Sequence, residues 1–282
     1  MIAVIESGAT KSDWRVIRED GCQCSRHLGQ GMNVSTMKME TIKSIMKEAA
    51  DLMTEPTAGI SELHLYIAGV VTECIRHELA QTLALLFPNA SIEIQDDLTA
   101  AARAICGHRP GIAAILGTGS NSCQYDGEKI IKRVYSGGYI LGDEGSAASL
   151  GKKFLADFIK GLVPQHIAEV FAAGHDSSYG SIVEKVYRAS GSPSAYLGSL
   201  APFIASYYSD PYVKELVDDN FRSFFQRTIR QYDHDSLPVG IAGGFGNAMK
   251  DIILDIAKEE GIQISAFVEK PIENLIKYHN HE

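Results

Sequence analysis

The stretch IAVIESGATKSDWRV, residues 2–16, decides the fold class of this chain. A short β-branched run, residues 2–5, precedes a turn of small residues, 7–10, and a second apolar run, 14–17. This order is typical of a β-hairpin. Small residues also let successive backbone amides converge on an anion, with hydroxyl groups as further donors. Taken alone, the turn favours the plain hairpin over a phosphate-binding turn.

Two further glycine-rich turns follow apolar, strand-like runs. Residues 113–125, AAILGTGSNSCQY, repeat the order of strand, small-residue turn and strand. Residues 237–249, LPVGIAGGFGNAM, place a glycine-rich turn before a helix-like pattern. Residues 115–120 align with residues 4–9, which suggests an internal repeat. Three such turns at strand ends favour a nucleotide held by two lobes, although a hairpin or a helix cap explains any one of them.

Strand-like and helix-like patterns alternate along the chain, which predicts an α/β fold with ligands at the strand ends. Helical spacing of apolar residues covers 37–53 and 71–87, and strand-like runs cover 62–69 and 91–97. Beyond residue 145 the chain is expected to be mostly helical. The expected helices there are 146–160, 164–173, 178–189 and 211–232, with a helix around residues 249–256 and a last one from about Pro271.

Composition limits the class of protein. The chain has 282 residues, a hydrophobic content of 45% and a net charge of −9. Without a basic cluster, nucleic acid is not an expected partner. No apolar run approaches the roughly 20 residues that span a bilayer, and the start lacks the pattern of a signal peptide. The five scattered cysteines do not form a disulfide framework. We therefore expect a cytoplasmic protein that does not bind membranes.

Several acidic residues lie at strand ends or in glycine-rich loops, where catalytic and ligand-binding groups are commonly found. Asp96 and Asp97 end a strand and begin a helix. Helix capping accounts for one of them, and the other is a candidate general base for a substrate hydroxyl. Asp143 and Glu144 stand in a glycine-rich stretch before the next helix, where they suit a metal or sugar hydroxyls, although capping explains one. Asn33 follows paired glycines and alone reads as a turn asparagine.

The order of ESGATKSDW, GMN, DD, LGTGSNS, GGYILGDEGSA and AGGFGNA resembles the BadF/BadG/BcrA/BcrD-type ATPase family, whose sugar-kinase branch contains the N-acetylglucosamine kinases. This family is part of the sugar-kinase, heat-shock ATPase and actin superfamily. The resemblance covers almost the whole chain, and LGDEGSA with GTGS upstream is its most specific part. It implies an α/β, actin-like ATPase fold: two ribonuclease-H-like lobes related by duplication, with a nucleotide cleft between them. The lobes would be residues 1–109, joined by a helix at about 270–282, and residues 110–269, which include a helical insertion.

The resemblance also implies the cofactors ATP and Mg²⁺ and the residues that bind them. The ATP-binding positions would be Gly8, Thr10 and Lys11 in a first phosphate loop, Gly117, Thr118 and Gly119 in a second, and Gly243, Gly244 and Asn247 near the adenosine. Asp97 matches the catalytic base of the family. Asn33, Gly138 and Asp143 fall where the sugar kinases hold the sugar.

One position departs from the family pattern. The family usually has aspartate where this chain has Glu6, in a position that faces the metal through water. The extra methylene moves the carboxylate about 1.5 Å further from the backbone. A water-mediated Mg²⁺ contact can absorb that shift, so the departure leaves open whether activity is lowered.

These observations predict an ATP-dependent kinase that phosphorylates the 6-hydroxyl of an amino sugar, with N-acetylglucosamine as the leading substrate. Phosphoryl transfer requires positioning and charge neutralisation more than covalent chemistry. One alternative is a partner-coupled ATPase that resembles the dehydratase activators, which hold an iron–sulfur cluster. Another is a nucleotide-binding regulator. The size is compatible with a homodimer.

Overall fold

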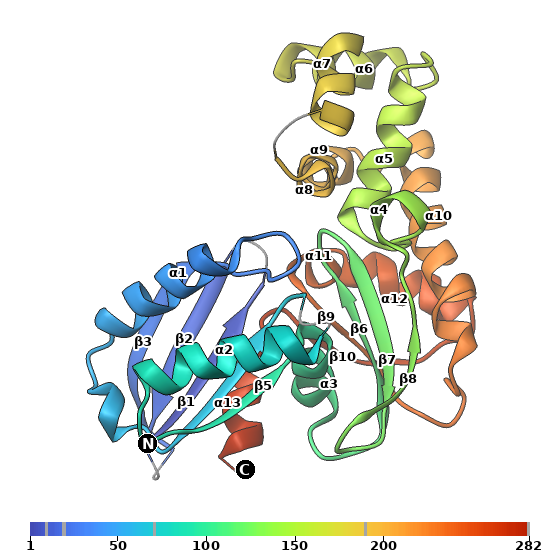
Figure 1. Cartoon of the computed structure of the whole chain (residues 1–282). Helices are drawn as coiled ribbons and strands as arrows, with labels where there is room; N and C mark the ends of the chain where they lie inside the picture. The colour runs from blue at the N-terminus through green and yellow to red at the C-terminus, as the bar shows by residue number, and fades with distance from the viewer. Residues whose placement is uncertain (9–10, 19–20, 70–71, 189–190, 281–282) are drawn as a thin grey trace. The chain divides into compact units, whose positions relative to one another are not determined.

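The computed structural model describes residues 1–8, 11–18, 21–69, 72–188 and 191–280. The chain divides into two compact units. Unit 1 comprises Met1–His108, Gly127–Lys129 and Lys270–Glu282, and unit 2 comprises Arg109–Asp126 and Ile130–Glu269. Each unit is built on its own five-stranded sheet (Figure 1). None of the described helices combines the length and the hydrophobicity that crossing a lipid bilayer requires.

The sheet of unit 1 has the strand order β3-β2-β1-β4-β5. Its strands are β1 (Ile2–Ser7), β2 (Lys11–Ile17), β3 (Gln23–Gln30), β4 (Glu62–Ile67) and β5 (Ser91–Gln95). The first three strands form an antiparallel meander, and β4 and β5 run parallel to β1. The carboxyl ends of β1, β4 and β5 therefore lie at the same end of the sheet. Glu6 is the next-to-last residue of β1, and Asp96 and Asp97 follow β5.

Helices cover both faces of this sheet (Figure 1). They are α1 (Met39–Asp51), α2 (Glu73–Leu86), α3 (Asp97–Cys106) and α13 (Ile272–His279), with a short 3₁₀ turn η1 at Thr57–Gly59. The apolar stripes of α1 and α2 share a buried cluster with Ala3 and Ile5 of β1. On the other side, Asn274 of α13 donates a hydrogen bond to the carbonyl oxygen of Ala104 in α3 over 2.7 Å. This second side carries the side chains that alternate with Ala3 and Ile5, including Glu6.

The sheet of unit 2 repeats the topology of the first. Its order is β10-β9-β6-β7-β8, formed by β6 (Gly111–Leu116), β7 (Ser120–Tyr125), β8 (Ile130–Val134), β9 (Val239–Ala242) and β10 (Ile264–Val268). Again three strands form an antiparallel meander, and two strands add in parallel. The β6–β7 turn thus corresponds to the β1–β2 turn. The repeated topology confirms the predicted α/β fold of two duplicated lobes.

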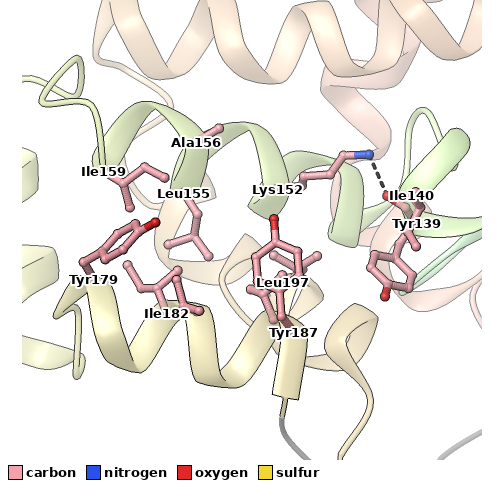
Figure 2. A pocket seen from close by; sticks show the side chains of 12 residues that line it. Tyr139, Ile140, Lys152, Leu155, Ala156, Ile159, Tyr179, Ile182, Tyr187 and Leu197 are labelled. Atoms are coloured by element: carbon pink, nitrogen blue, oxygen red, sulfur yellow. Dashed lines mark hydrogen bonds between the residues drawn. The ribbon is translucent and has the colours of Figure 1, made fainter.

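A large helical segment lies between β8 and β9 in unit 2. Its helices are α4 (Gly138–Leu141), α5 (Ala147–Phe158), α6 (Gln165–Gly174), α7 (Tyr179–Val183), the π-helical turn η2 (Glu184–Arg188), α8 (Pro193–Gly198), α9 (Ala201–Ala205), α10 (Pro211–Arg227) and the 3₁₀ turn η3 (Ile229–Gln231). Residues of α5 and α7 face each other across a pocket (Figure 2). Helices α11 (Gly244–Ala248) and α12 (Lys250–Glu259) follow β9.

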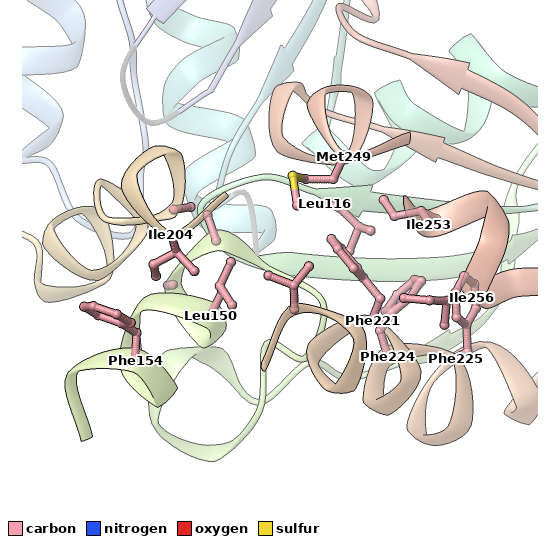
Figure 3. Packing of buried hydrophobic residues seen from close by; sticks show 14 of the residues in the cluster. Leu116, Leu150, Phe154, Ile204, Phe221, Phe224, Phe225, Met249, Ile253 and Ile256 are labelled. Atoms are coloured by element: carbon pink, nitrogen blue, oxygen red, sulfur yellow. The ribbon is translucent and has the colours of Figure 1, made fainter. Parts of the chain in front are cut away.

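The core of unit 2 packs this helical layer on the sheet. Phe221, Phe224 and Phe225 of α10 point towards Leu116 of β6 and the isoleucines of α12 (Figure 3). All three phenylalanines are buried. The core holds α10 against the strand that leads into the second glycine-rich turn, and so fixes that turn.

The helix boundaries differ from the expected ones in three places. The helix expected at 178–189 is α-helical only to Val183 and continues as a π-helical turn. The helix expected at 211–232 ends at Arg227 and is followed by a separate 3₁₀ turn. The helix expected around 249–256 is α12, which begins at Lys250, and the glycine-rich turn expected before it forms the separate short helix α11; between them Met249 has a non-helical backbone with φ −103° and ψ 14°.

Candidate functional site

The first turn joins β1 to β2 in unit 1. The backbone N–H of Gly8 donates to the carbonyl oxygen of Lys11 over 3.0 Å and closes the turn. Lys11 is exposed and begins β2. Thr10, predicted as an ATP-binding residue, lies outside the described residues. The turn therefore presents a glycine and an exposed ammonium at the end of β1.

Three carboxylates approach one another where β1 ends. Glu6 pairs with Asp13 across the β1–β2 hairpin. The pKa of Glu6 is raised to about 7. Burial is the main cause, and the negative charges of Asp13 and Asp97 contribute the rest of the rise. Asp13 is itself held by Arg15 at 2.5 Å and Arg26 at 3.2 Å. These carboxylates are hard oxygen donors of the kind that Mg²⁺ prefers, but the group of described residues whose ligand atoms all lie within 4.8 Å of one another is His64, Glu93 and His279, and Glu6, Asp13 and Asp97 do not form such a group.

Asp96 and Asp97 have different places at the start of α3. Asp96 is the N-cap residue, and its Oδ1 accepts hydrogen bonds from the backbone N–H of Thr99 at 2.8 Å and from its hydroxyl at 2.5 Å. Asp97 is the first residue of the helix and is half-buried. Its charge acts on Glu6. Capping thus explains Asp96, and Asp97 remains the candidate base.

Asn33 lies beside the end of β4, next to Ala68. Its Oδ1 accepts a hydrogen bond from the backbone N–H of Ser35 over 2.9 Å. Gly69 fits against it with φ +84°, and a Cβ there would lie 2.5 Å from the Asn33 Oδ1. The side chain is therefore fixed in one orientation, with its oxygen in the turn and its amide nitrogen as the group that can donate to a ligand.

The second turn, residues 117–119, is held by the start of α5. The backbone N–H groups of Ala147 and Ala148 donate to the carbonyl oxygens of Gly117 and Thr118, each over 3.0 Å. Within the turn, the N–H of Gly117 donates to the carbonyl oxygen of Gly119 over 3.0 Å. The carbonyls of the loop thus point to the helix, and the loop is a rigid part of unit 2.

A cavity of about 510 Å³ adjoins this loop within unit 2. Gly117 and Thr118 line it together with Gly244, so the structure brings three of the predicted ATP-binding residues together. A Cβ on Gly244 would meet no atom within 4 Å. The remaining lining residues are small or apolar: Ala147, Gly198, Ala201, Pro202, Ala205, Phe245, Ala248 and Met249. The cavity is large and apolar enough for a nucleoside.

The other predicted ATP-binding residues of unit 2 lie beside this cavity without lining it. Gly243 has φ +111°, and a Cβ there would lie 2.6 Å from the carbonyl oxygen of Leu116. Asn247 donates its backbone N–H to the carbonyl oxygen of Gly243 within the helical turn. Gly119 packs against Asp143, whose Oδ2 would be 3.1 Å from a Cβ on the glycine. These positions shape the backbone around the cavity.

Asp143 is buried next to the second turn. Its Oδ1 accepts a hydrogen bond from the backbone N–H of Ser120 over 3.3 Å. Burial raises its pKa, and hydrogen bonds from Ser120 and Ser136 with the charge of Lys152 offset part of this rise. The residue has φ +60°, a conformation that is rare for a non-glycine residue and common at functional sites. Asp143 is thus a strained, buried acid at the phosphate-loop candidate.

Gly138 and Glu144, which lie near Asp143 in the sequence, have different structural roles. Gly138 begins α4 with φ +70°, and a Cβ on it would meet no atom within 4 Å. Glu144 pairs with Arg227 at 3.0 Å. The open space at Gly138 agrees with a backbone that a ligand can approach, whereas Glu144 forms a structural ion pair.

Two sets of candidate site residues were not predicted from the sequence. Asp13 lay in the first quoted stretch, and its position opposite Glu6 in a hairpin was the signal that could have identified it. The apolar residues of α8, α9 and α11 that line the nucleoside-sized cavity carried no signal. Alanine and proline lack reactive groups, so only the folded structure shows that they share a surface.

The sequence matches neither a family model nor a curated protein. Solved structures do match. A candidate N-acetylglucosamine kinase from Porphyromonas gingivalis is 34% identical, with a TM-score of 0.92 over 100% of this chain and 99% of that chain. A candidate N-acetylglucosamine kinase from Chromobacterium violaceum is 19% identical, with a TM-score of 0.76 over 98% of each chain.

More distant structures share the fold. A glucokinase of the ROK family from Streptomyces griseus, solved with glucose and AMPPNP, has a TM-score of 0.55 at 15% identity and covers 98% of this chain and 97% of its own. At that identity the likeness concerns the fold alone. The P. gingivalis protein, by contrast, is 34% identical over the full length of this chain. The chain therefore belongs to the N-acetylglucosamine kinase-like family.

Proposed function

We propose that the protein is an ATP-dependent kinase that phosphorylates the 6-hydroxyl of an amino sugar, with N-acetylglucosamine as the leading substrate. The observation that carries this proposal is the 34% identity with the candidate N-acetylglucosamine kinase over the whole chain. A candidate N-acetylmannosamine kinase of the same fold agrees with an amino sugar in general. The comparisons do not favour a partner-coupled ATPase.

ATP fits the features of unit 2. The apolar cavity beside Gly244 would hold the adenosine, because its size and lining suit a nucleoside. Thr118 and Gly119 would direct backbone amides at the phosphates, and Thr118 also its hydroxyl, as glycine-rich turns do. Gly117, whose own N–H is engaged within the turn, would let the phosphates approach the backbone. Gly243 and Asn247 would shape the adenosine end. In unit 1, Gly8, Thr10 and Lys11 would contact the phosphates, and Lys11 supplies a positive charge.

The carboxylates of unit 1 fit Mg²⁺. Glu6, Asp13 and Asp97 would offer hard oxygen donors, and a bound cation would offset the cost of holding the partly buried Glu6 carboxylate in its charged form. Glu6 would face the ion through a water molecule, which accommodates its longer side chain. When bound, Mg²⁺ would neutralise charge on the phosphates.

The chain's own residues account for the proton and the acceptor. Asp97 would accept the proton of the sugar 6-hydroxyl as that oxygen bonds to the γ-phosphorus and the bond to the oxygen of ADP breaks. Asn33 would donate its side-chain amide to a sugar hydroxyl, since its oxygen is engaged by Ser35. Asp143 would accept from a second hydroxyl, and Gly138 would let the backbone approach the ring.

The test is ADP release by the purified protein with Mg-ATP, measured across a panel of free and N-acetylated hexosamines. We expect turnover that depends on the sugar and is highest with an N-acetylated hexosamine. Mass spectrometry of the product should place the phosphate on the 6-oxygen. ADP release that is the same with and without every sugar would refute the proposal and point to a partner-coupled ATPase. ATP binding without turnover would point to a regulator.

A further inference from the structure

The helical segment of unit 2 contains a second cavity, which none of the proposed roles uses. Its volume is about 380 Å³, within the range of small-molecule sites. Helix α5 contributes Leu155 and Ile159, and α7 with its π-helical turn contributes Tyr179, Ile182 and Tyr187 (Figure 2). The lining is therefore mainly aliphatic and aromatic.

Among the described residues that line this cavity, Lys152 is the one with a charged side chain. Its ammonium lies at the end next to α4 and donates a hydrogen bond to the carbonyl oxygen of Tyr139 over 2.6 Å (Figure 2). Within the described ranges Lys152 forms no ion pair at contact distance, although its charge acts on the Asp143 carboxyl, whereas the next residue, Lys153, pairs with Asp219 at 3.1 Å. An ammonium has three donors, so Lys152 can bind an anion as well as the carbonyl.

The rim of the cavity exposes large apolar side chains. Tyr187 is 80% exposed, Tyr179 71% and Ile140 69%. These exposed side chains line a cavity, which is where exposed apolar surface indicates a ligand site. A ligand with an apolar body would cover these side chains, and a single negative charge would match the single positive charge of Lys152.

We infer that this cavity binds a small molecule with an apolar body and one carboxylate or sulfonate group, which Lys152 holds. The body lies along the aromatic and aliphatic wall between α5 and α7. The anionic group lies at the α4 end, where the ammonium is.

Occupancy of the cavity reaches the candidate sugar-binding segment through α4. Lys152 ties down the carbonyl of Tyr139, the residue after Gly138, and Asp143 follows the end of α4. An anion that shares the Lys152 ammonium weakens its hydrogen bond to the Tyr139 carbonyl and so loosens this end of the helix. This second step rests on the proposed function, because Gly138 and Asp143 affect the KM of the sugar only if they contact it.

The binding experiment uses anilinonaphthalene sulfonate, a fluorescent dye with an aromatic body and one sulfonate, on the full chain. We expect saturable binding that octanoate displaces and octanol does not, because only octanoate carries the charge. Lys152→Gln should weaken dye binding by about fivefold, the upper end of what an exposed ion pair contributes. Ala156→Trp, which fills the cavity, should abolish it.

Lys153→Gln is the matched control, since it removes a neighbouring lysine on the same helix that does not line the cavity. It should bind the dye like the parent protein. Equal dye affinity in the parent and in Lys152→Gln, with both melting at the same temperature, would overturn the inference. Dye binding that weakens as the protein concentration rises would also overturn it, because a second copy of the chain would then occupy the cavity.

The kinetic experiment tests the second step separately. Octanoate should raise the KM for the sugar and leave kcat nearly unchanged, and the KM of Lys152→Gln should not respond to octanoate. Dye binding as expected with a constant KM would refute the coupling and leave the binding site. Because the dye experiment requires no turnover, its result does not depend on the kinase assignment.

Discussion

Glu6 and Asp13 lie directly opposite each other in the β1–β2 hairpin, so two carboxylates face the same side of the sheet at the start of the first turn. Like charges in such a pair repel, and Arg15 and Arg26 compensate Asp13 but not Glu6. Burial and these neighbouring charges bring the pKa of Glu6 to about 7. Burial is thus the main reason that charging Glu6 is unfavourable, and the negative charges of Asp13 and Asp97 add to it.

Replacing Glu6 by glutamine should stabilise the metal-free protein at alkaline pH. Between pH 4.5, the ordinary pKa, and about pH 7, the folded chain holds a proton on Glu6 that the unfolded chain has lost. The free energy of unfolding therefore falls as the pH rises across this window. Above it, Glu6→Gln should be more stable than the parent by about 3 kcal/mol, with no difference below pH 4.5. Urea unfolding in the presence of a chelator measures this.

The control for this experiment is Glu215→Gln, which changes an exposed glutamate in the middle of α10. Its stability relative to the parent should not vary with pH. A Glu6→Gln effect of the same size at both ends of the pH range would contradict the raised pKa.

Asp97→Asn should lower kcat by about 10²- to 10⁴-fold, because the amide cannot accept the proton of the sugar hydroxyl. The affinity for ATP, measured by calorimetry, should change little. Asp96→Asn is the matched control: asparagine caps helices as well as aspartate does, so α3 should persist and most activity should remain. A folded Asp97→Asn protein with near-parental kcat would rule out Asp97 as the base.

Glu93→Gln should destabilise unit 1 at neutral pH. Burial raises the pKa of Glu93, but hydrogen bonds from His64 and Arg103 outweigh burial and hold the pKa well below its usual range. Such a lowered pKa contributes stability above the unfolded value of 4.5, and this contribution is lost as the pH falls below that value. We expect a loss of about 1–3 kcal/mol at neutral pH, discounted for partial exposure.

Thermal unfolding as a function of pH checks this prediction. Glu62→Gln serves for comparison, because Glu62 approaches His64 only at 3.5 Å and its side chain is 53% exposed. It should cost little at any pH. A Glu93→Gln deficit that persists unchanged in acid would show that packing, and not the charge of Glu93, is responsible.

Two adjacent glycines should respond in opposite ways to a side chain. At Gly244, a Cβ has open space, so Gly244→Leu should fold normally and fill the nucleoside-sized cavity. We expect the KM for ATP to rise by about tenfold or more. At Gly243, the left-handed backbone and the close carbonyl of Leu116 should make Gly243→Ala cost about 2–4 kcal/mol of stability. ADP-release kinetics and urea unfolding of both variants separate the effects. A parental KM in Gly244→Leu would place the adenosine elsewhere.

The sequence predicted the strands that carry the glycine-rich turns, because apolar runs that end in glycine leave a strong local pattern. It also predicted that one of Asp96 and Asp97 is a helix cap, and the structure shows that Asp96 has this place. The short helix α11 was not predicted, because the glycines at 243, 244 and 246 are typical of a turn.

The site was predictable where residues bear distinctive chemistry. Glu6, Asp97 and Asp143 stood out as acids in unusual surroundings, and each adjoins another candidate residue within its own unit. Asp13 escaped notice because its role depends on the strand register. The apolar lining from α8 and α9 escaped because it depends on tertiary packing. Such information resides in contacts between distant segments, which local patterns do not encode.

The division of the chain has a consequence for its synthesis. Unit 1 needs Lys270–Glu282, including α13, a segment that follows the whole of unit 2 in the chain. Glu273 of α13 reaches back to Arg15 of β2 at 2.8 Å. Since a ribosome delivers residues in order and domains tend to fold as they emerge, unit 2 can acquire its complete core first. Unit 1, in contrast, can complete its fold only after α13 has been synthesised.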